Sequence, residues 1–290
     1  MKYLNLPEIN HTNYDYNSDD FQDFKKPVII RGGCKDMIAY KKWDINYIFD
    51  NTPVLPADIF LSKEDMKTSS PKERATMFNS EFLKENIFNK SPPYYYISNQ
   101  FIPNEDLKII SEIKTKSDNY RVPGWNGYSG YNLFIGNETY TNSHLHFYQD
   151  FLVNVIKGKK IFYMWHVDDN KSLHNEKYKM THYNTKNFWK RDHSKMKIYK
   201  VLLNEGDSMI LPPWWYHAVY TPGFCIMVAK IYNKRYSPMY LFNKNNFSIN
   251  ELIKKITKIY KLNEKKNKYN NKIIIFILLF IILLLLKNYY

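Results

Sequence analysis

The segment TNSHLHFYQDFLVNVIKGKKIFYMW, residues 141–165, joins two apolar runs to a pair of histidines one residue apart. FLVNVI (151–156) and KIFYMW (160–165) have the length of buried strands, and KGK between them reads as a turn. Side chains two apart on a strand point to the same face, so His144 and His146 can converge on one ion. The segment therefore predicts β structure beside a candidate metal site.

Further short apolar runs follow the same pattern between turn signals such as GN, EGD and TPG, at 131–136, 197–203, 208–212, 217–220 and 225–232. Several short strands at this spacing predict an antiparallel sandwich or barrel, not a βαβ fold. Strands are also expected at 26–33 and 94–98, helices at 41–51 and 103–116, and a helix-and-loop stretch at 56–78. Lys230, within the last apolar run, either faces the pocket or is a solvated lysine at an edge, and the second interpretation is favoured.

A third candidate ligand, His217, lies in EGDSMILPPWWYHAVY, residues 205–220. Three protein ligands hold a redox metal and leave coordination positions open for oxygen and a cosubstrate. We expect His217 to come from a strand across the barrel. An H-x-H pair alone is weak evidence, because strand alternation often produces one. The other interpretations are a surface-facing pair at His144 and His146 and a hydrogen-bonded core histidine at His217.

GDSMILPPWWYHAV (206–219) resembles the second half of the JmjC/cupin-like oxygenases, which use Fe(II) and 2-oxoglutarate. The segment that contains SHLHFY and KGKKIFYMW is similar to the first metal strand of that family and to the lysine-bearing strand after it. KKPVIIRGG and KKWDINYIF are similar to the N-terminal strand and helix of its protein hydroxylase branch. The resemblance covers roughly residues 20 to 235 and is most specific around His217.

The resemblance implies a mainly β fold, a double-stranded β-helix (jelly roll) with flanking helices. It implies Fe(II) ligands at His144, His146 and His217, with Lys160 pairing with the distal carboxylate of 2-oxoglutarate and Thr141 contacting the same carboxylate. A protein or peptide substrate would be hydroxylated or N-demethylated on a side chain. The alternative is a catalytically inactive cupin-like binding module tethered to a membrane.

The chain departs from the family at the middle ligand, where His146 replaces the usual aspartate or glutamate. In one interpretation the site is a three-histidine iron site, since neutral imidazole suits Fe(II). In the other, His146 is the first histidine and Tyr148 or Asp150 lies near the position of the missing carboxylate. In either interpretation, the missing carboxylate favours a degenerate, inactive cupin.

The C-terminal part predicts a membrane anchor. Residues 273–286, IIIFILLFIILLLL, are uninterrupted apolar residues that would rise about 21 Å as a helix, less than the roughly 30 Å hydrocarbon core of a bilayer. Flanking lysines and tyrosines favour insertion, with the body on the cytosolic side. We therefore expect an irregular segment at 1–25, a cupin-like domain at 26–247, an amphipathic helix at 248–264, a basic linker at 265–272 and a single-pass anchor at 273–286.

Composition narrows the class of partner. The chain has 290 residues, of which 44% are hydrophobic, and can bury a substantial core. Its formal net charge of +14 would suit nucleic acid or an anionic membrane surface. The body contains no basic helix or base-stacking motif, so nucleic acid is not expected as a partner. Two cysteines without CxxC spacing fit a reducing compartment and argue against a disulfide framework or a cysteine-based zinc site.

Overall fold

A computed structural model describes residues 4–6, 8–10, 26–102, 108–113, 125–146, 149–167, 188–190, 192–194 and 196–234. The predicted helix at 248–264, the linker at 265–272 and the anchor at 273–286 lie outside the described residues, as does most of 1–25. None of the helices within the described ranges has the length and apolarity that crossing a bilayer requires. The membrane anchor therefore stays a prediction.

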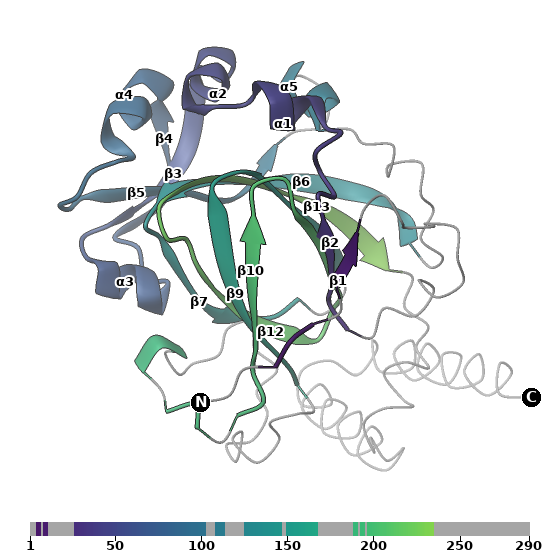
Figure 1. Cartoon of the computed structure of the whole chain (residues 1–290). Coiled ribbons are helices and arrows are strands. Elements are labelled where there is room, and N and C mark those ends of the chain that lie inside the picture. Colours follow the sequence, from purple (N-terminus) through teal and green to yellow (C-terminus); the bar gives the residue numbers. More distant parts are fainter. Residues whose placement is uncertain are drawn as a thin grey trace, which may run out of the picture. The chain divides into compact units, whose positions relative to one another are not determined.

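The strands of the described residues form two sheets in which neighbours are antiparallel, apart from the parallel pair β1–β2. Figure 1 shows the two sheets enclosing a common interior. The larger sheet has the order β1 (Glu8–Asn10), β2 (Val28–Arg31), β11 (Ser208–Leu211), β8 (Gln149–Lys157), β13 (Phe224–Lys234), β6 (Trp125–Asn137), β5 (Tyr94–Ile102), β3 (Val54–Phe60) and β4 (Glu73–Asn79). The smaller has the order β10 (Tyr199–Asn204), β9 (Lys159–His166), β12 (Trp215–Tyr220) and β7 (Tyr140–His144).

The two sheets face each other across one apolar core. The larger sheet supplies alternate residues of β8, β11 and β13, such as Val153, Met209 and Met227, and the smaller supplies Phe162 and Val201. From β7 to β13 the chain passes repeatedly from one sheet to the other, so a strand's partners lie far away in sequence. This arrangement confirms a mainly β, antiparallel fold and is consistent with the predicted jelly roll.

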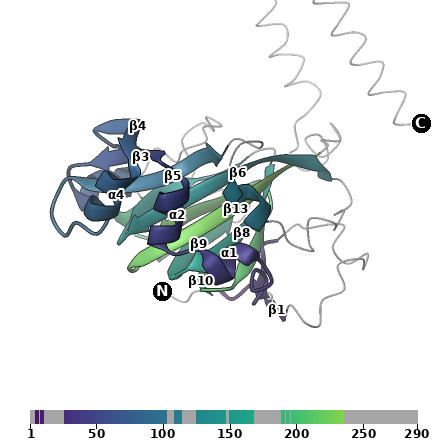
Figure 2. The same cartoon turned by 90° about the horizontal axis from the view of Figure 1, so that it is seen from above.

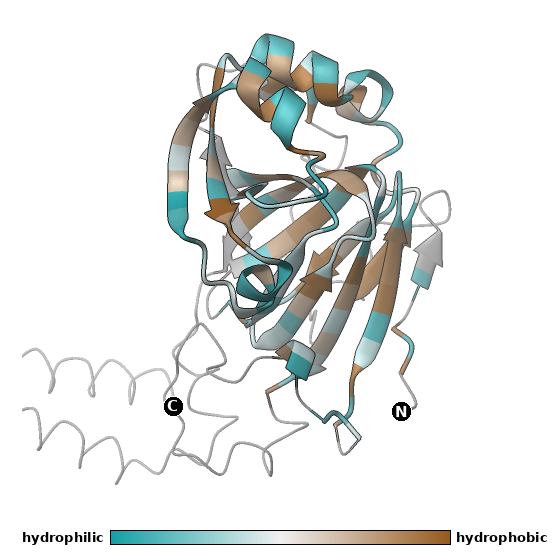
Figure 3. Cartoon of the chain, turned by 90° about the vertical axis from the view of Figure 1, so that its left-hand side faces the viewer, coloured by the Kyte–Doolittle hydropathy of each residue, from teal (hydrophilic) through white to brown (hydrophobic). Residues whose placement is uncertain are grey.

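Short helices cover the outer face of the larger sheet, as Figure 2 shows from above. Trp43, Ile48 and Leu83 pack beneath them against Leu133 and Val228 of the sheet. Figure 3 shows that the strands enclosing the interior are coloured mostly as hydrophobic. These helices are α1 (Ile38–Lys42), α2 (Ile45–Asn51), α4 (Ser80–Asn86) and α5 (Lys108–Glu112). The helix α3 (Lys63–Thr68) lies instead beside β7, where its Met66 packs with Phe60 and Tyr96, and η5 (Phe188–Lys190) is a 3₁₀ turn.

Side-chain caps and buried polar bonds fix these helices. The Asp44 carboxylate accepts a bond from Tyr47 N at the start of α2, which satisfies a backbone donor that the helix itself leaves unpaired. Glu112 of α5 is 4% exposed and accepts bonds from Lys42 Nζ, Trp43 Nε1 and Tyr47 Oη. One buried carboxylate thus ties three helices together over the sheet.

Most of the strands predicted from the sequence are present, but the segment 56–78 differs from its prediction. It was expected to be helix and loop, and the structure has the antiparallel pair β3 and β4 on either side of the short helix α3. The alternation of polar and apolar residues is broken there by Pro56 and by a register shift between Ala57 and Ile59. These two strands extend the larger sheet to the rim of the cavity described below.

Candidate metal centre

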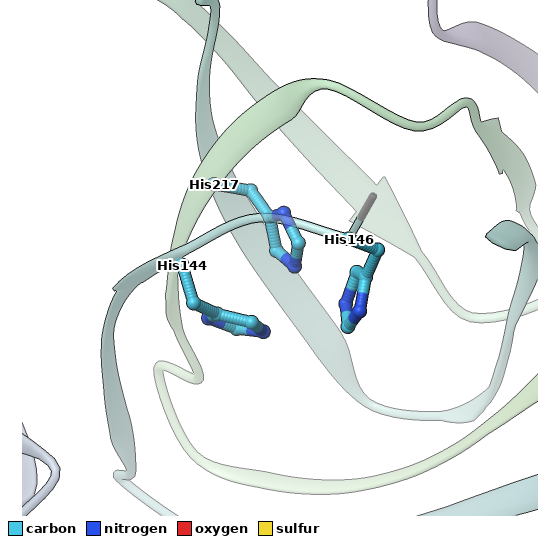
Figure 4. A group of neighbouring side chains, drawn as sticks. All are labelled: His144, His146 and His217. Atoms are coloured by element: carbon cyan, nitrogen blue, oxygen red, sulfur yellow. The ribbon is translucent and has the colours of Figure 1, made fainter. Parts of the chain in front are cut away.

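Three histidine side chains come together in the interior. One ligand atom each from His144, His146 and His217 lies within 4.8 Å of the other two. Figure 4 shows the three side chains pointing toward one another. Their ring centroids are 4.2 Å apart for His144 and His217, and 5.2 Å for each of the other pairs. Among the described residues, no other group of three or more histidine, cysteine, aspartate or glutamate side chains is arranged to hold a metal ion.

His217 does not reach the cluster from across the barrel, and that expectation was wrong. It lies on β12, directly beside β7, and its Cα partner in the antiparallel register is His144. Side chains at directly opposite positions of neighbouring strands have Cβ atoms about 5 Å apart. The register of one strand pair therefore brings two of the three imidazoles together, although they are far apart in the sequence.

A bulge in β7 decides which side chains share this face. Between the pairs Thr141–Val219 and His144–His217, two residues of β7, Asn142 and Ser143, lie opposite the single residue Ala218 of β12, so β7 contains one extra residue. Without it, strict alternation would turn Thr141 and His144 to opposite faces. The amide oxygen of Asn142 accepts bonds from Ser143 N and Phe188 N and holds the bulge. Thr141 and His144 consequently both line the cavity.

His146 lies just beyond the end of β7, so alternation along a strand does not place it. Its carbonyl instead accepts a bond of 3.0 Å from Trp214 N. Trp214 has a φ of 69°, a left-handed conformation that is uncommon for a bulky residue. The PPWW turn before β12 therefore fixes the backbone of His146, a role that the sequence motif alone did not indicate.

Backbone carbonyls determine the tautomers of two of the rings. His217 Nδ1 lies 3.2 Å from Trp215 O, and His144 Nδ1 lies 3.1 Å from Asn142 O. Because a carbonyl only accepts, each Nδ1 carries the proton and each Nε2 keeps its lone pair for a ligand. Burial, together with the neighbouring His144 and His146, lowers the pKa of His217 well below its usual value. The neutral form that a metal requires is thus favoured.

The cluster lines a cavity of about 510 Å³ between the two sheets. Lys160 of β9, which is 2% exposed, lines the same cavity. Its Nζ donates to Tyr96 Oη at 3.2 Å and lies 5.2 Å from the centroid of the Phe134 ring. No carboxylate in the described part of the chain forms an ion pair with Lys160. An ammonium buried in this way calls for an anionic ligand.

Two residues of the cavity escaped the sequence analysis. Tyr96 of β5 contacts Lys160, and Asp58 of β3, the Cα partner of Tyr96, lines the cavity beside it. YYYIS was recognised as a strand, but its three tyrosines are alike in sequence. Only the register of β5 decides which of them points inward. For Asp58 there was no signal, because its strand was not predicted.

The position of Asp150 disfavours the interpretation in which His146 is the first histidine and Tyr148 or Asp150 lies near the position of the missing carboxylate. Asp150 is fully buried on β8, where its Cα partner is Tyr232 of β13, and it is not one of the residues around the cavity. Tyr148, the other candidate, lies outside the described residues. Lys230 also differs from its prediction: it is 0% exposed, with Nζ 5.9 Å from the centroid of the Tyr131 ring. The central position of β13, between β6 and β8, explains its burial.

The fold and the cavity define a mainly β protein that gathers three imidazoles and a buried lysine between two antiparallel sheets. The model of the cupin-like domain matches residues 16–237, most of the chain, and the chain belongs to that family. Comparison with curated proteins found no match.

Proposed function

We propose that this protein is an Fe(II)- and 2-oxoglutarate-dependent oxygenase that hydroxylates or N-demethylates a protein side chain. One observation carries the proposal: three imidazoles and a buried lysine without a carboxylate partner among the described residues line a single cavity. His144, His146 and His217 would hold the metal, and Lys160 would pair with the distal carboxylate of 2-oxoglutarate. Imidazole nitrogen suits Fe(II), so the donor set fits the ion.

The strand register supports the distance that such a cosubstrate has to span. Met164 of β9 is the Cα partner of His217, and Lys160 precedes Met164 by four residues. At about 3.3 Å per residue, the two positions are roughly 13 Å apart along the strand. The side chains of Lys160 and His217 reach into the space between these positions. There a five-carbon dicarboxylate would contact the imidazole at one end and the ammonium at the other. Thr141 adds a hydroxyl to the same wall.

Each residue then has a defined task. When bound, the metal and 2-oxoglutarate supply the activation of oxygen that oxidises a C–H bond. The Nδ1 bonds to backbone carbonyls orient His144 and His217. The Lys160 ammonium, held by Tyr96, fixes one end of the cosubstrate through a charge-assisted bond. Leu145, Phe151 and Phe162 line the cavity and exclude water from it.

A second candidate function follows from the missing carboxylate. The cluster contains three neutral ligands, one negative charge fewer than the usual two-histidine, one-carboxylate site. This favours, as the alternative, an inactive cupin-like module that binds a partner while tethered to a membrane by residues 273–286. In either case we propose a body facing the cytosol and a protein or peptide as the bound partner.

Anaerobic loading of the full chain with Fe(II), followed by 2-oxoglutarate and air, distinguishes the oxygenase from the inactive binding module. The oxygenase binds about one iron per chain and forms succinate. His217→Ala loses both iron and succinate, whereas His166→Ala, which removes a histidine outside the cluster, keeps both. If the folded wild-type chain binds no iron and forms no succinate, the oxygenase proposal fails. If a partner is then bound equally well by His217→Ala, the binding module remains.

A further inference from the structure

Asn142, in the bulge of β7, connects the metal centre to two other parts of the chain. It is 6% exposed and is not one of the residues around the cavity. The proposed chemistry gives it no task, because it neither holds the metal nor faces the cosubstrate. Its backbone nevertheless contacts a candidate ligand, and its side chain contacts an element that lies far away in the sequence.

The backbone carbonyl of Asn142 orients the first of the three imidazoles. It lies 3.1 Å from His144 Nδ1 and accepts the proton of that nitrogen, which leaves Nε2 for a metal. If the peptide unit that follows Asn142 were rotated, the carbonyl would move away and the imidazole could turn. Loss of such a partner on the outer nitrogen of a ligand histidine typically lowers metal affinity by about tenfold to hundredfold.

The side chain of Asn142 fixes this same peptide unit. Its Oδ1 accepts a bond of 2.8 Å from Ser143 N, which shares a rigid plane with the Asn142 carbonyl. The same oxygen accepts a second bond, of 3.0 Å, from Phe188 N of η5, 46 residues further along the chain. The amide oxygen of Asn142 therefore links η5 to the peptide plane that orients His144.

A third bond ties Asn142 to α3. β7 is an edge strand of the smaller sheet, so an amide on its open side has no neighbouring strand to accept its proton. The hydroxyl of Ser69 takes this place and accepts a bond of 3.0 Å from Asn142 N. Ser69 is the C-terminal cap of α3 and lines the cavity. The bulge is thus held at its edge as well as through its side chain.

η5 packs on the outer face of the smaller sheet, behind the metal centre. Phe188 is 4% exposed, and its ring stacks on Trp165 of β9 with centroids 5.4 Å apart. Trp165 points away from the cavity, because it lies an odd number of positions from Phe162, which lines the cavity. Trp189 stands edge-on to Tyr140 of β7 with centroids 5.2 Å apart. Aromatic contacts therefore hold η5 where Phe188 N can reach Asn142.

We propose that Asn142 is a positioning residue through which the docking of η5 sets the orientation of His144 and hence the affinity of the centre for its metal. The inference rests on the proposed function, because it assigns a regulatory element to the same metal centre. With η5 docked, Asn142 Oδ1 is held by two amides and the carbonyl faces His144. With η5 displaced, the side chain loses one of these two bonds and the peptide plane is less firmly held. Because linkage is reciprocal, metal binding strengthens the docking of η5 by the same factor.

The test titrates the metal-free full chain with Co(II), a probe whose visible spectrum depends on the geometry of its ligands. Asn142→Ala removes the acceptor of both amides, whereas Asn142→Asp keeps an oxygen at the same position. Trp189→Ala weakens the contact of η5 with Tyr140 and leaves β7 unchanged. Asn204→Ala is the matched control, since it removes an exposed asparagine from β10 of the same sheet.

Asn142→Ala binds Co(II) about tenfold to hundredfold more weakly than the wild-type chain, with an altered spectrum. Asn142→Asp recovers most of the affinity and the wild-type spectrum. Trp189→Ala binds more weakly than the wild-type chain, and Asn204→Ala matches it. Wild-type affinity and spectrum in Asn142→Ala, or an Asn142→Asp chain as weak as Asn142→Ala, would overturn the inference. If Asn142→Ala does not fold, Trp189→Ala decides, and an unchanged affinity in that variant would overturn the inference.

Hydrogen exchange separates positioning from a purely structural role. Added Co(II) slows exchange of the Phe188 amide in the wild-type chain and in Asn142→Asp, because metal binding and the docking of η5 favour each other. If Asn142 only supported the fold, its loss would speed this exchange while Co(II) left the wild-type rate unchanged. An exchange rate that does not respond to Co(II) in the wild-type chain would therefore overturn the inference.

Failure of the proposed function would be seen separately. If the folded wild-type chain binds neither Fe(II) nor Co(II), the metal centre falls and the inference falls with it. If the chain binds metal without any effect of Asn142→Ala or Trp189→Ala, only the inference is overturned. If iron binds and the coupling is present but no succinate forms, the oxygenase is removed and the role of Asn142 at a metal centre stands.

Discussion

Replacement of Lys160 by methionine should stabilise the ligand-free protein. Methionine keeps most of the volume of the side chain and adapts to an irregular space. The substitution removes the bond to Tyr96 Oη and the contact with Phe134, which together contribute about 1–3 kcal/mol. It also ends the desolvation of a buried ammonium, a penalty of several kcal/mol. We therefore expect Lys160→Met to raise the free energy of unfolding by about 1–3 kcal/mol.

Urea unfolding of the ligand-free chain measures this change, and thermal unfolding should show a rise of about 2–4 °C per kcal/mol for a domain of this size. The 2-oxoglutarate analogue N-oxalylglycine, added with Mn(II), should stabilise the wild-type protein against unfolding, and Lys160→Met should lose this stabilisation. Lys159→Met, which replaces the exposed neighbour on β9, should change stability by less than about 0.5 kcal/mol and keep ligand binding. Destabilisation of Lys160→Met by more than about 1 kcal/mol would refute the reasoning. It would show that groups of the protein itself offset the desolvation penalty of the Lys160 ammonium.

Two further predictions concern His217 and a turn. In metal-free protein, His217 stays neutral while the same residue in the unfolded chain binds a proton below about pH 6.5, so the free energy of unfolding falls as the pH drops from 6.5 to 5. His217→Gln should flatten this dependence by up to about 1.4 kcal/mol per pH unit in urea titrations, and parallel profiles would contradict the assignment. Gly158→Ala should cost at least about 3 kcal/mol, because φ is +77° and the new Cβ would lie 2.0 Å from Phe224 O. Gly223→Ala, at φ +151° with nothing within 4 Å of the new Cβ, should cost clearly less in the same measurement, and equal losses would argue against the clash.

The strands that carry the candidate ligands could be predicted because their apolar runs are short, regular and bounded by turn residues. Runs such as 151–156 and 160–165 lie within β8 and β9, and their inward residues form the core between the sheets. The convergence of His144, His146 and His217 was likewise expected from the motifs, and the structure brings them together. Local sequence is sufficient where an apolar run of strand length has a clear turn at each end.

The remaining features depend on the register in which the strands pair, and local sequence patterns do not reveal that register. The bulge at Asn142 and Ser143 decides that Thr141 faces the cavity, and an alternation rule would have turned it away. Asp58 and Tyr96 are neighbours only because β3 pairs with β5. The β3–β4 pair itself was missed because a proline and a register shift interrupt its pattern. Each of these is set by a long-range pairing that overrides the local signal.

Both cysteines are buried and unpaired, and this has a practical consequence. Burial raises the pKa of the Cys34 thiol to about 12 and that of Cys225 to about 11. Alkylating reagents and probes attack the thiolate, so at neutral pH the native fold offers them almost no reactive sulfur. A cysteine introduced at an exposed position could therefore be labelled with a spin probe or a cross-linker while both natural thiols stay in place. Motions near the cavity could then be followed spectroscopically without first rebuilding the interior of the protein.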